Sequence, residues 1–233
     1  MNVIQQFHAA VAVAEQDPAM AGAYLLGSRL AFAAAQVLRA QAAGLSVSGG
    51  EQLVRVPLGA SNDDAAAAER LQFTAGEGPC LDAHADQEAI MASSAVIAAT
   101  WPQFARQLQA QTPFRSVFAV PLPRIGALDV YFTDPNGCGA VDVADVAVVA
   151  QQIWIALIDS GLPTALTHRT PESGEGRRAQ VSIAMGMLMV TLAVSAPEAL
   201  AVLRARAFSG DRLIEDLAED VVAGRVMPDQ LLS

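Results

Sequence analysis

The residues most capable of covalent chemistry in this sequence are two widely separated cysteines, Cys80 and Cys138. Cys80 lies in "GEGPC", where Pro79 can open a short helix. The N-terminus of a helix lowers the pKa of a thiol, so one interpretation makes Cys80 a nucleophile or a redox sensor. The other makes it a small side chain packed beneath the turn. We favour the second because no other cysteine lies nearby in sequence to resolve an oxidised thiol.

No arrangement of residue types indicates a catalytic or metal centre. The cysteines have no C-x-x-C or Cys/His spacing, and the sequence contains no catalytic triad, phosphate loop or paired carboxylate site. His84 follows one turn after Cys80, but a lone histidine on a short helix is more often a partly exposed polar residue than a ligand. We therefore expect no catalytic residue, no metal and no cofactor. If the chain were an enzyme, Cys80 would be its nucleophile.

Aromatic and basic residues after this turn could line a ligand pocket. In "WPQF", Trp101 and Phe104 either line such a pocket or enter the core at the start of a helix. Arg115 and Arg124 flank the segment "SVFAVPL", where they either meet an anionic ligand or remain solvated. The candidate ligand-binding residues are Cys80, Trp101, Phe104 and Arg115.

The stretch "VSIAMGMLMVTLAVSAPEALAVLRARAFSG", residues 181–210, contains a second candidate site. Its first helix has two apolar faces, so neighbouring helices can cover one, while a second subunit or the N-terminal domain must cover the other. A strip of small residues between them includes Ser182 and Gly186. Glycine inside a helix costs about 1 kcal/mol relative to alanine, so we expect another helix or a nucleic-acid strand to approach Gly186 closely. The apolar faces are Val181, Ala184, Met185, Leu188, Met189 and Leu192, and Ile183, Met187 and Val190.

The segment "SAPE" predicts the start of the next helix, with Ser195 as N-cap and Glu198 closing a capping box. On that helix, Arg204 lies at the edge of the buried stripe, whereas Arg206 points away from it. Arg204 either pairs with Glu198 or an acid of the third helix, or presents its guanidinium to phosphate or a base. The acids of the third helix are expected to form a solvated face: Glu215, Asp216, Glu219 and Asp220.

The charge and hydropathy of the chain limit its partners. The formal net charge is −10, and all 14 basic residues are arginine. This argues against general electrostatic binding of nucleic acid and leaves room for a small, shape-specific contact. No apolar run reaches the roughly 18 residues of a membrane span, and the N-terminus lacks the charged region of a signal peptide. We therefore expect a cytoplasmic protein with no membrane partner.

Turn residues and hydrophobic periodicity divide the chain into two regions. Short strands are predicted at "LSVS", "EQLVRVPLG", "EAIMAS", "FRSVFAVPL" and "GALDVYFTD". Helices are predicted over about 19–43, 63–71, 101–111 and 141–160, and Gly44 is expected to cap the first of these. The pattern predicts an α+β domain over 1–160, a linker over 161–175 and an all-α domain of three helices over 176–233.

Three segments resemble a GAF domain of the bacterial regulator type: "GEGPCLDA", "TWPQFARQLQAQTPFRSVFAVPL" and "GALDVYF". The resemblance extends over about 45–160. It implies an antiparallel sheet flanked by helices, in a module that usually binds a small molecule in a pocket over one sheet face. It does not identify the ligand.

The segments "AMGMLM", "VSAPEALAVLR" and "LIEDLAEDVV" resemble an ANTAR domain, the RNA-binding module of bacterial transcription-antitermination regulators, over about 173–226. The chain departs from the family at two positions, with Met185 where lysine is frequent and Ala193 where glycine is frequent. The resemblance implies binding, usually as a dimer, to paired hairpin loops of nascent RNA, which prevents terminator formation. The matching positions are Ala184, Gly186, Leu188, Met189, Ala199, Arg204 and Ala218.

Together these features predict a signal-responsive regulator, a homodimer whose N-terminal domain senses a small ligand and whose C-terminal domain binds RNA. RNA loops are read by stacking and by contacts to base edges, for which a few arginines suffice. The alternative is a small-molecule sensor or protein-interaction module whose C-terminal helices only dimerise. The missing lysine at position 185 and the acidic charge favour this alternative. The candidate RNA-binding residues are Arg178, Ser182, Gly186, Arg204 and Arg206.

Overall fold

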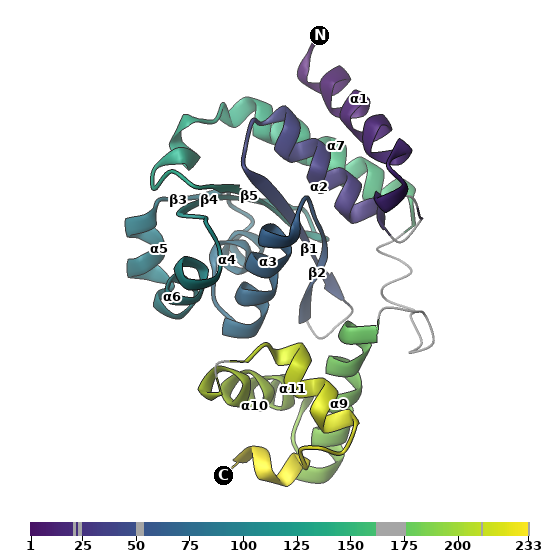
Figure 1. Cartoon of the computed structure of the whole chain (residues 1–233), viewed down its shortest axis with the longest axis vertical. Coiled ribbons are helices and arrows are strands. Elements are labelled where there is room, and N and C mark those ends of the chain that lie inside the picture. Colours follow the sequence, from purple (N-terminus) through teal and green to yellow (C-terminus); the bar gives the residue numbers. More distant parts are fainter. Residues whose placement is uncertain (21, 23–24, 50–53, 162–175, 211, 233) are drawn as a thin grey trace.

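The structure is a computed structural model that describes residues 1–20, 22, 25–49, 54–161, 176–210 and 212–232. It confirms the predicted α+β class: a five-stranded antiparallel sheet with helices is followed by C-terminal helices (Figure 1). The strand order in the sheet is β2-β1-β5-β4-β3. The strands are β1 (Ala42–Gly49), β2 (Val54–Ala60), β3 (Ile90–Ala92), β4 (Ser116–Leu122) and β5 (Gly126–Phe132).

β4 and β5 form a hairpin near the centre of the sheet, and β1 pairs with the other side of β5. The hairpin turns at Arg124, whose φ of 63° lies in the left-handed region. Successive side chains of a strand point to opposite faces, so Leu128 and Val130 lie on one face of β5 while Asp129 and Tyr131 lie on the other. Both faces of β5 are buried.

Helices cover both faces of the sheet (Figure 1). One face packs through an apolar core on α1 (Val3–Gln16), α2 (Leu26–Val37) and α7 (Val143–Asp159). The other face carries α3 (Asp63–Ala75), α4 (Pro79–Asp86), α5 (Ser94–Thr100) and α6 (Pro102–Gln111). The core on this second side includes the aromatic residues Trp101, Phe104, Phe114 and Tyr131.

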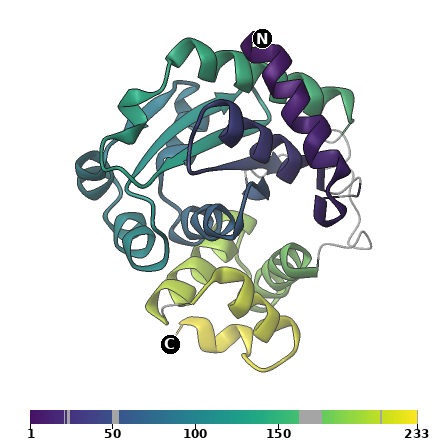
Figure 2. The same cartoon turned by 45° about the horizontal axis from the view of Figure 1, so that its top comes forward.

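The C-terminal helices enclose an apolar core of their own. They are α9 (Gly176–Leu192), α10 (Ala196–Ser209) and α11 (Ile214–Val222), followed by a 3-10 turn, η4 (Pro228–Leu232). This core also contains Phe73, a buried residue near the end of α3 in the N-terminal part of the chain. Both views of the molecule place α10 and α11 beneath α3 (Figures 1 and 2).

The predicted start of α10 is confirmed. The Glu198 Oε2 atom accepts hydrogen bonds from the backbone N–H and the hydroxyl of Ser195 at 2.7 and 2.6 Å. The first apolar face predicted for α9 also lies inward, with Val181, Ala184 and Leu188 buried in the C-terminal core. Capping and helical periodicity are local signals, which is why the sequence reveals them.

The predicted helix over 19–43 is wrong in extent. A 3-10 turn covers Pro18–Met20, α2 ends at Val37, and the chain is already in β1 from Ala42. Alanine favours helix locally, but Ala42 and Ala43 pair with β5 and are fully buried, so sheet pairing overrides propensity. Gly44 is therefore a strand residue, not a helix cap, and a Cβ there would overlap the side chain of Glu69.

No single helix of the described residues is long and apolar enough to cross a membrane. The segments Gln180–Leu192 and Ala196–Ser209 pass that test of length and composition only as a pair, and they are bent by 108° at the turn between them.

Candidate functional site

Arg204 of α10 lies against the C-terminal end of α3. Its Nε donates a hydrogen bond to the carbonyl oxygen of Phe73 at 2.9 Å, and its Cζ lies 5.4 Å from the centroid of the Phe73 ring. The last carbonyls of a helix have no intrahelical donor and lie at the negative end of the helix dipole, so a guanidinium is a favourable partner for them. The same position is desolvated, and burial lowers the pKa of Arg204 from its ordinary value.

Arg204 makes this contact instead of an ion pair with Glu198 or with an acid of α11. The Glu198 carboxylate is bonded to Ser195 at the start of α10. Within the part of the chain that the structure describes, no carboxylate lies within ion-pair distance of Arg204. Of the two alternatives for Arg204, the pairing with Glu198 or with an acid of α11 is therefore wrong, because the guanidinium lies against the end of α3 instead.

Gly76 allows this close approach. It ends α3 in the left-handed conformation, with φ of 69°, and its N–H donates to the Gln72 carbonyl at 3.0 Å. A Cβ at this position would lie only 3.2 Å from Cδ of Arg204. Glycine thus serves both the helix cap and the contact with α10.

Other side chains extend the contact between α3 and the C-terminal helices. The Phe73 ring is buried in the C-terminal core, and the Ile214 N–H donates to the Thr74 hydroxyl at 3.4 Å. A second cation–π contact lies nearby, where Cζ of Arg106 on α6 is 5.7 Å from the centroid of the Phe208 ring. We call the group formed by Phe73, Thr74, Gly76, Arg204 and Ile214 the α3–α10 contact.

One turn earlier, α3 contributes to a buried polar cluster beneath the sheet, defined by Glu69, Gln72, Cys80, Asp129 and Tyr131. The Gln72 Nε2 atom donates to Oδ2 of Asp129 at 2.6 Å and to the Tyr131 hydroxyl at 3.1 Å. The Tyr131 hydroxyl donates to Oε1 of Glu69 at 2.8 Å. The Gln72 Oε1 atom accepts the backbone N–H of Cys80 at 3.0 Å. Gln72 is therefore the link between α3, α4 and β5.

The cluster lies in a low-dielectric environment. Glu69, Gln72 and Asp129 are at most 2% exposed, and Tyr131 is fully buried. Burial raises the pKa of Tyr131 well above its ordinary value, and the nearby Glu69, Asp129 and Cys80 raise it further. The phenol therefore remains a protonated donor, which the hydrogen bond to Glu69 requires.

Among the described residues, Glu69, Cys80 and Asp129 form the group with ligand atoms close enough to hold a metal ion, all within 4.8 Å of one another. Thiolate and carboxylate groups are both ligand types that Zn²⁺ accepts, although here Asp129 and Glu69 accept hydrogen bonds from Gln72 and Tyr131. The spacing along the chain did not reveal this group, because three separate elements bring the side chains together.

The sequence contained one signal for the buried polar cluster. Asp129 interrupts the apolar strand "GALDVYF", and a carboxylate in the middle of a buried strand must have partners. Tyr131 lies two residues later and so shares its face of the sheet. Glu69 and Gln72 carried no comparable signal, because polar residues on a helix are usually solvated.

The predicted ligand-binding residues fall into three settings. Cys80 is buried in the polar cluster, whereas Trp101 and Phe104 are buried in the adjoining apolar core. The Trp101 indole N–H donates to Oδ2 of Asp82 at 2.9 Å. Arg115 donates to the carbonyl oxygens of Thr112 and Phe114 at 2.9 and 2.6 Å, so its guanidinium is bound to backbone beside β4.

Two residues near Cys80 have structural contacts. The His84 Nδ1 donates to the carbonyl oxygen of Gly126 at 3.1 Å, which ties α4 to the start of β5. The Glu77 carboxylate, two residues before α4, accepts the N–H groups of Gln103 and Phe104 at 2.6 and 3.0 Å. It therefore caps α6 and fixes the helix that carries Phe104.

The predicted RNA-binding residues of α9 lie on its outer side. Ser182 and Gly186 are exposed, and a Cβ at Gly186 would meet nothing within 4 Å. No other helix in the described part of this chain approaches Gly186, since α10 and α11 pack on the other side of α9. Approach of a helix from a second subunit or of a nucleic-acid strand stays a prediction. Arg206 is exposed on α10, and the side chain of Arg178 lies outside the described residues.

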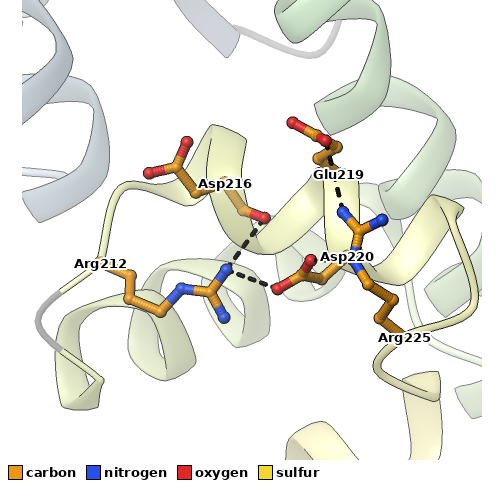
Figure 3. Close-up of polar contacts among 5 residues, drawn as sticks. All are labelled: Arg212, Asp216, Glu219, Asp220 and Arg225. Carbon is orange, nitrogen blue, oxygen red and sulfur yellow. Dashed lines mark hydrogen bonds and ion pairs between the residues drawn. The ribbon is translucent and has the colours of Figure 1, made fainter.

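The remaining described arginines of the C-terminal helices are held by carboxylates (Figure 3). Arg212 pairs with Oδ2 of Asp220 at 2.6 Å, and Arg225 pairs with Asp220 and with Glu219. The expected solvated acidic face is wrong at one position, Glu215, which is only 4% exposed. α11 packs against α9, and the N–H of the neighbouring Ile214 is bonded to Thr74 at the end of α3.

Comparisons with protein-family models, with curated proteins and with solved structures find no match to this chain. Function is therefore inferred from the chain's own residues and contacts.

Proposed function

We propose that this chain is a signal-responsive RNA-binding regulator of transcription antitermination. A GAF-like sheet domain would sense a small ligand, and ANTAR-like helices α9, α10 and α11 would bind paired hairpin loops of nascent RNA. The order of a five-stranded sheet followed by helices with a separate apolar core supports this division of roles.

The proposal rests on a contrast among the arginines of the C-terminal helices. Arg204 and Arg206 have no acidic partner among the described residues, whereas Arg212 and Arg225 are paired with carboxylates. A guanidinium that contacts phosphate or stacks on a base needs N–H groups that carboxylates have not taken. Both arginines without acidic partners are on α10, the helix that carries the ANTAR-like arginine position.

The outer side of α9 supports the same function. Ser182 and Gly186 are exposed and small, so a nucleic-acid backbone can approach this helix closely at Gly186. Such a surface adds shape recognition to the few arginine contacts, and an acidic protein needs it because general electrostatic attraction to RNA is weak here.

The buried polar cluster supports a sensing role for the sheet domain. It places amide, carboxyl, phenol and thiol groups between α3, α4 and β5, over one face of the sheet, and a GAF-like module usually binds its ligand over one sheet face. A small polar ligand that exchanges hydrogen bonds with Gln72 would act directly on α3.

The test is binding of the full chain to a pool of two-hairpin RNAs with randomised loops, at fixed near-physiological salt. We expect recovery of particular loop sequences and weak binding of the same stems with scrambled loops. Arg206→Ala should weaken binding by about tenfold or more, the effect of losing one good contact. Arg225→Ala is the matched control, since Asp220 and Glu219 already occupy that side chain, and it should bind as the wild type does. Failure of the pool to yield any preferred loop would refute the proposal.

One observation favours the alternative in which the C-terminal helices only dimerise. Val190 is 85% exposed and Ile183 is 37% exposed, and both belong to the second apolar face of α9. Under this alternative, Val190→Ser would abolish a dimer seen by sedimentation, and no loop sequence would be enriched from the pool.

A further inference from the structure

The α3–α10 contact occupies the guanidinium that the proposed function assigns to RNA. The Nε of Arg204 is bonded to the Phe73 carbonyl, one face of the group lies over the Phe73 ring, and Gly76 closes in from the end of α3. RNA recognition by an arginine uses the same N–H groups and the same planar face. While Arg204 keeps these contacts, its Nε–H and one face of its guanidinium are not available to RNA.

The contact is a favourable environment for a cation in its own right. It combines the unpaired carbonyls of a helix C-terminus, the negative end of the α3 dipole and the face of an aromatic ring. To use these groups RNA must displace the contact, so its apparent affinity equals the intrinsic affinity multiplied by the fraction of molecules in which the contact is open.

α3 also links this contact to the buried polar cluster. Gln72 bonds Asp129, Tyr131 and the Cys80 N–H, and the next two residues, Phe73 and Thr74, hold α10 and α11. Because these positions are consecutive on one helical turn, a shift of Gln72 moves the carbonyl that binds Arg204.

We propose that the structure is a closed state in which the end of α3 masks Arg204, and that RNA binding requires this contact to open. The masking rests on the proposed RNA-binding function. The polar cluster offers a means of control, because Gln72 bonds Asp129, Tyr131 and Cys80 one residue before the carbonyl that holds Arg204.

The experiment compares full-length variants for binding to the two-hairpin RNA pool and measures the radius of gyration of each variant by small-angle X-ray scattering. Phe73→Ala removes the ring from Arg204 and from the C-terminal core. We expect it to enlarge the molecule and to tighten loop-dependent RNA binding about tenfold. The matched control is Phe132→Ala, because Phe132 is also 5% exposed but lies on the opposite face of the sheet. It should leave the RNA affinity unchanged.

The double variant with Phe73→Ala and Arg204→Ala should lose the tenfold rise in RNA affinity. That loss would show that the group unmasked by Phe73→Ala is the Arg204 guanidinium. If Phe73→Ala does not fold, Phe73→Leu tests the masking instead, because it keeps an apolar side chain in the C-terminal core but removes the aromatic face. It should still raise RNA affinity, by a smaller factor.

The outcomes separate the two proposals. Loop-dependent binding that is equally tight in the wild type and in an opened Phe73 variant would overturn the masking and leave the RNA-binding function intact. Absence of loop preference in every variant, opened or closed, would refute the function itself.

Discussion

Two polar networks in this molecule are built around neighbouring carboxylates, and they differ in burial and in charge balance. Beneath the sheet, Glu69 and Asp129 are joined through the neutral donors Tyr131 and Gln72. At the surface, carboxylates of α11 are joined to arginines (Figure 3). Solvent exposure decides how much each bond contributes to stability, because water screens the surface pairs but cannot replace a lost partner in the interior.

The α3–α10 contact lies between these two cases. Arg204 is half-buried and is bound to a carbonyl and a ring, with no carboxylate beside it in the described part of the chain. This contact joins α10 to the end of α3 without the full Coulomb attraction of a buried ion pair. Such a contact suits the opening that we propose.

The largest effect on stability is expected from Tyr131→Phe. This change deletes the hydroxyl that donates to Glu69 and accepts from Gln72, so two buried groups each lose a bond. The free energy of unfolding should fall by about 2–3 kcal/mol, as for hydrogen bonds to charged or buried groups. Urea unfolding at neutral pH, followed by circular dichroism, measures it.

Thr112→Val is the matched control for this prediction. It also deletes a buried hydroxyl, but one whose partners are neutral backbone groups of Leu108 and Phe114. It should cost about 1 kcal/mol or less. A loss in Tyr131→Phe no greater than the loss in Thr112→Val would show that the cluster is not the tightly coupled network described.

A smaller effect is expected from Arg204→Ala. The Phe73 carbonyl loses its donor and the ring loses its cation, so the free energy of unfolding of the C-terminal helices should fall by about 1–2 kcal/mol. Arg206→Ala, two residues along α10 and exposed, should change it by less than about 0.5 kcal/mol. Equal losses of unfolding free energy in the two variants, measured by urea unfolding, would show that the contact of Arg204 with Phe73 does not stabilise the C-terminal helices.

The smallest effect is expected from acid titration of the surface network. Hydrogen bonds from Arg212 and then Arg225 hold the pKa of Asp220 below its ordinary value. A carboxyl with a lowered folded-state pKa stabilises the fold above its ordinary pKa, and this stabilisation is lost as the pH falls below about 4 through the lowered value. Thermal unfolding of the wild type should decline over that range, and Arg225→Ala should decline less steeply. Parallel declines would show that the ion pair with Arg225 contributes nothing.

The sequence predicted the elements whose signals are local. Apolar strand segments bounded by turn residues gave correct positions for the strands, and Ser195 with Glu198 marked the start of α10. The helix predicted over 19–43 extends too far because, in this alanine-rich stretch, helix propensity competes with pairing along β5. Only the tertiary fold reveals that pairing.

The candidate site was predictable only in part. The amphipathic pattern of α10 placed Arg204 beside the core, but its partner Phe73 lies 131 residues earlier, where no spacing rule could connect them. The position of Glu215 was missed for the same reason, since it is buried by elements distant in sequence. Sequence patterns indicated which helix face is apolar, but not which distant element covers it.

The most direct test of the masked arginine is amide hydrogen exchange of the full chain, with and without a two-hairpin RNA isolated from the pool. The account predicts that RNA speeds exchange at Gly76 and Ile214, whose N–H groups are bonded at the end of α3, because binding separates α10 and α11 from that helix. Slower or unchanged exchange at both sites while the RNA is bound would contradict it, because the contact would then persist in the complex.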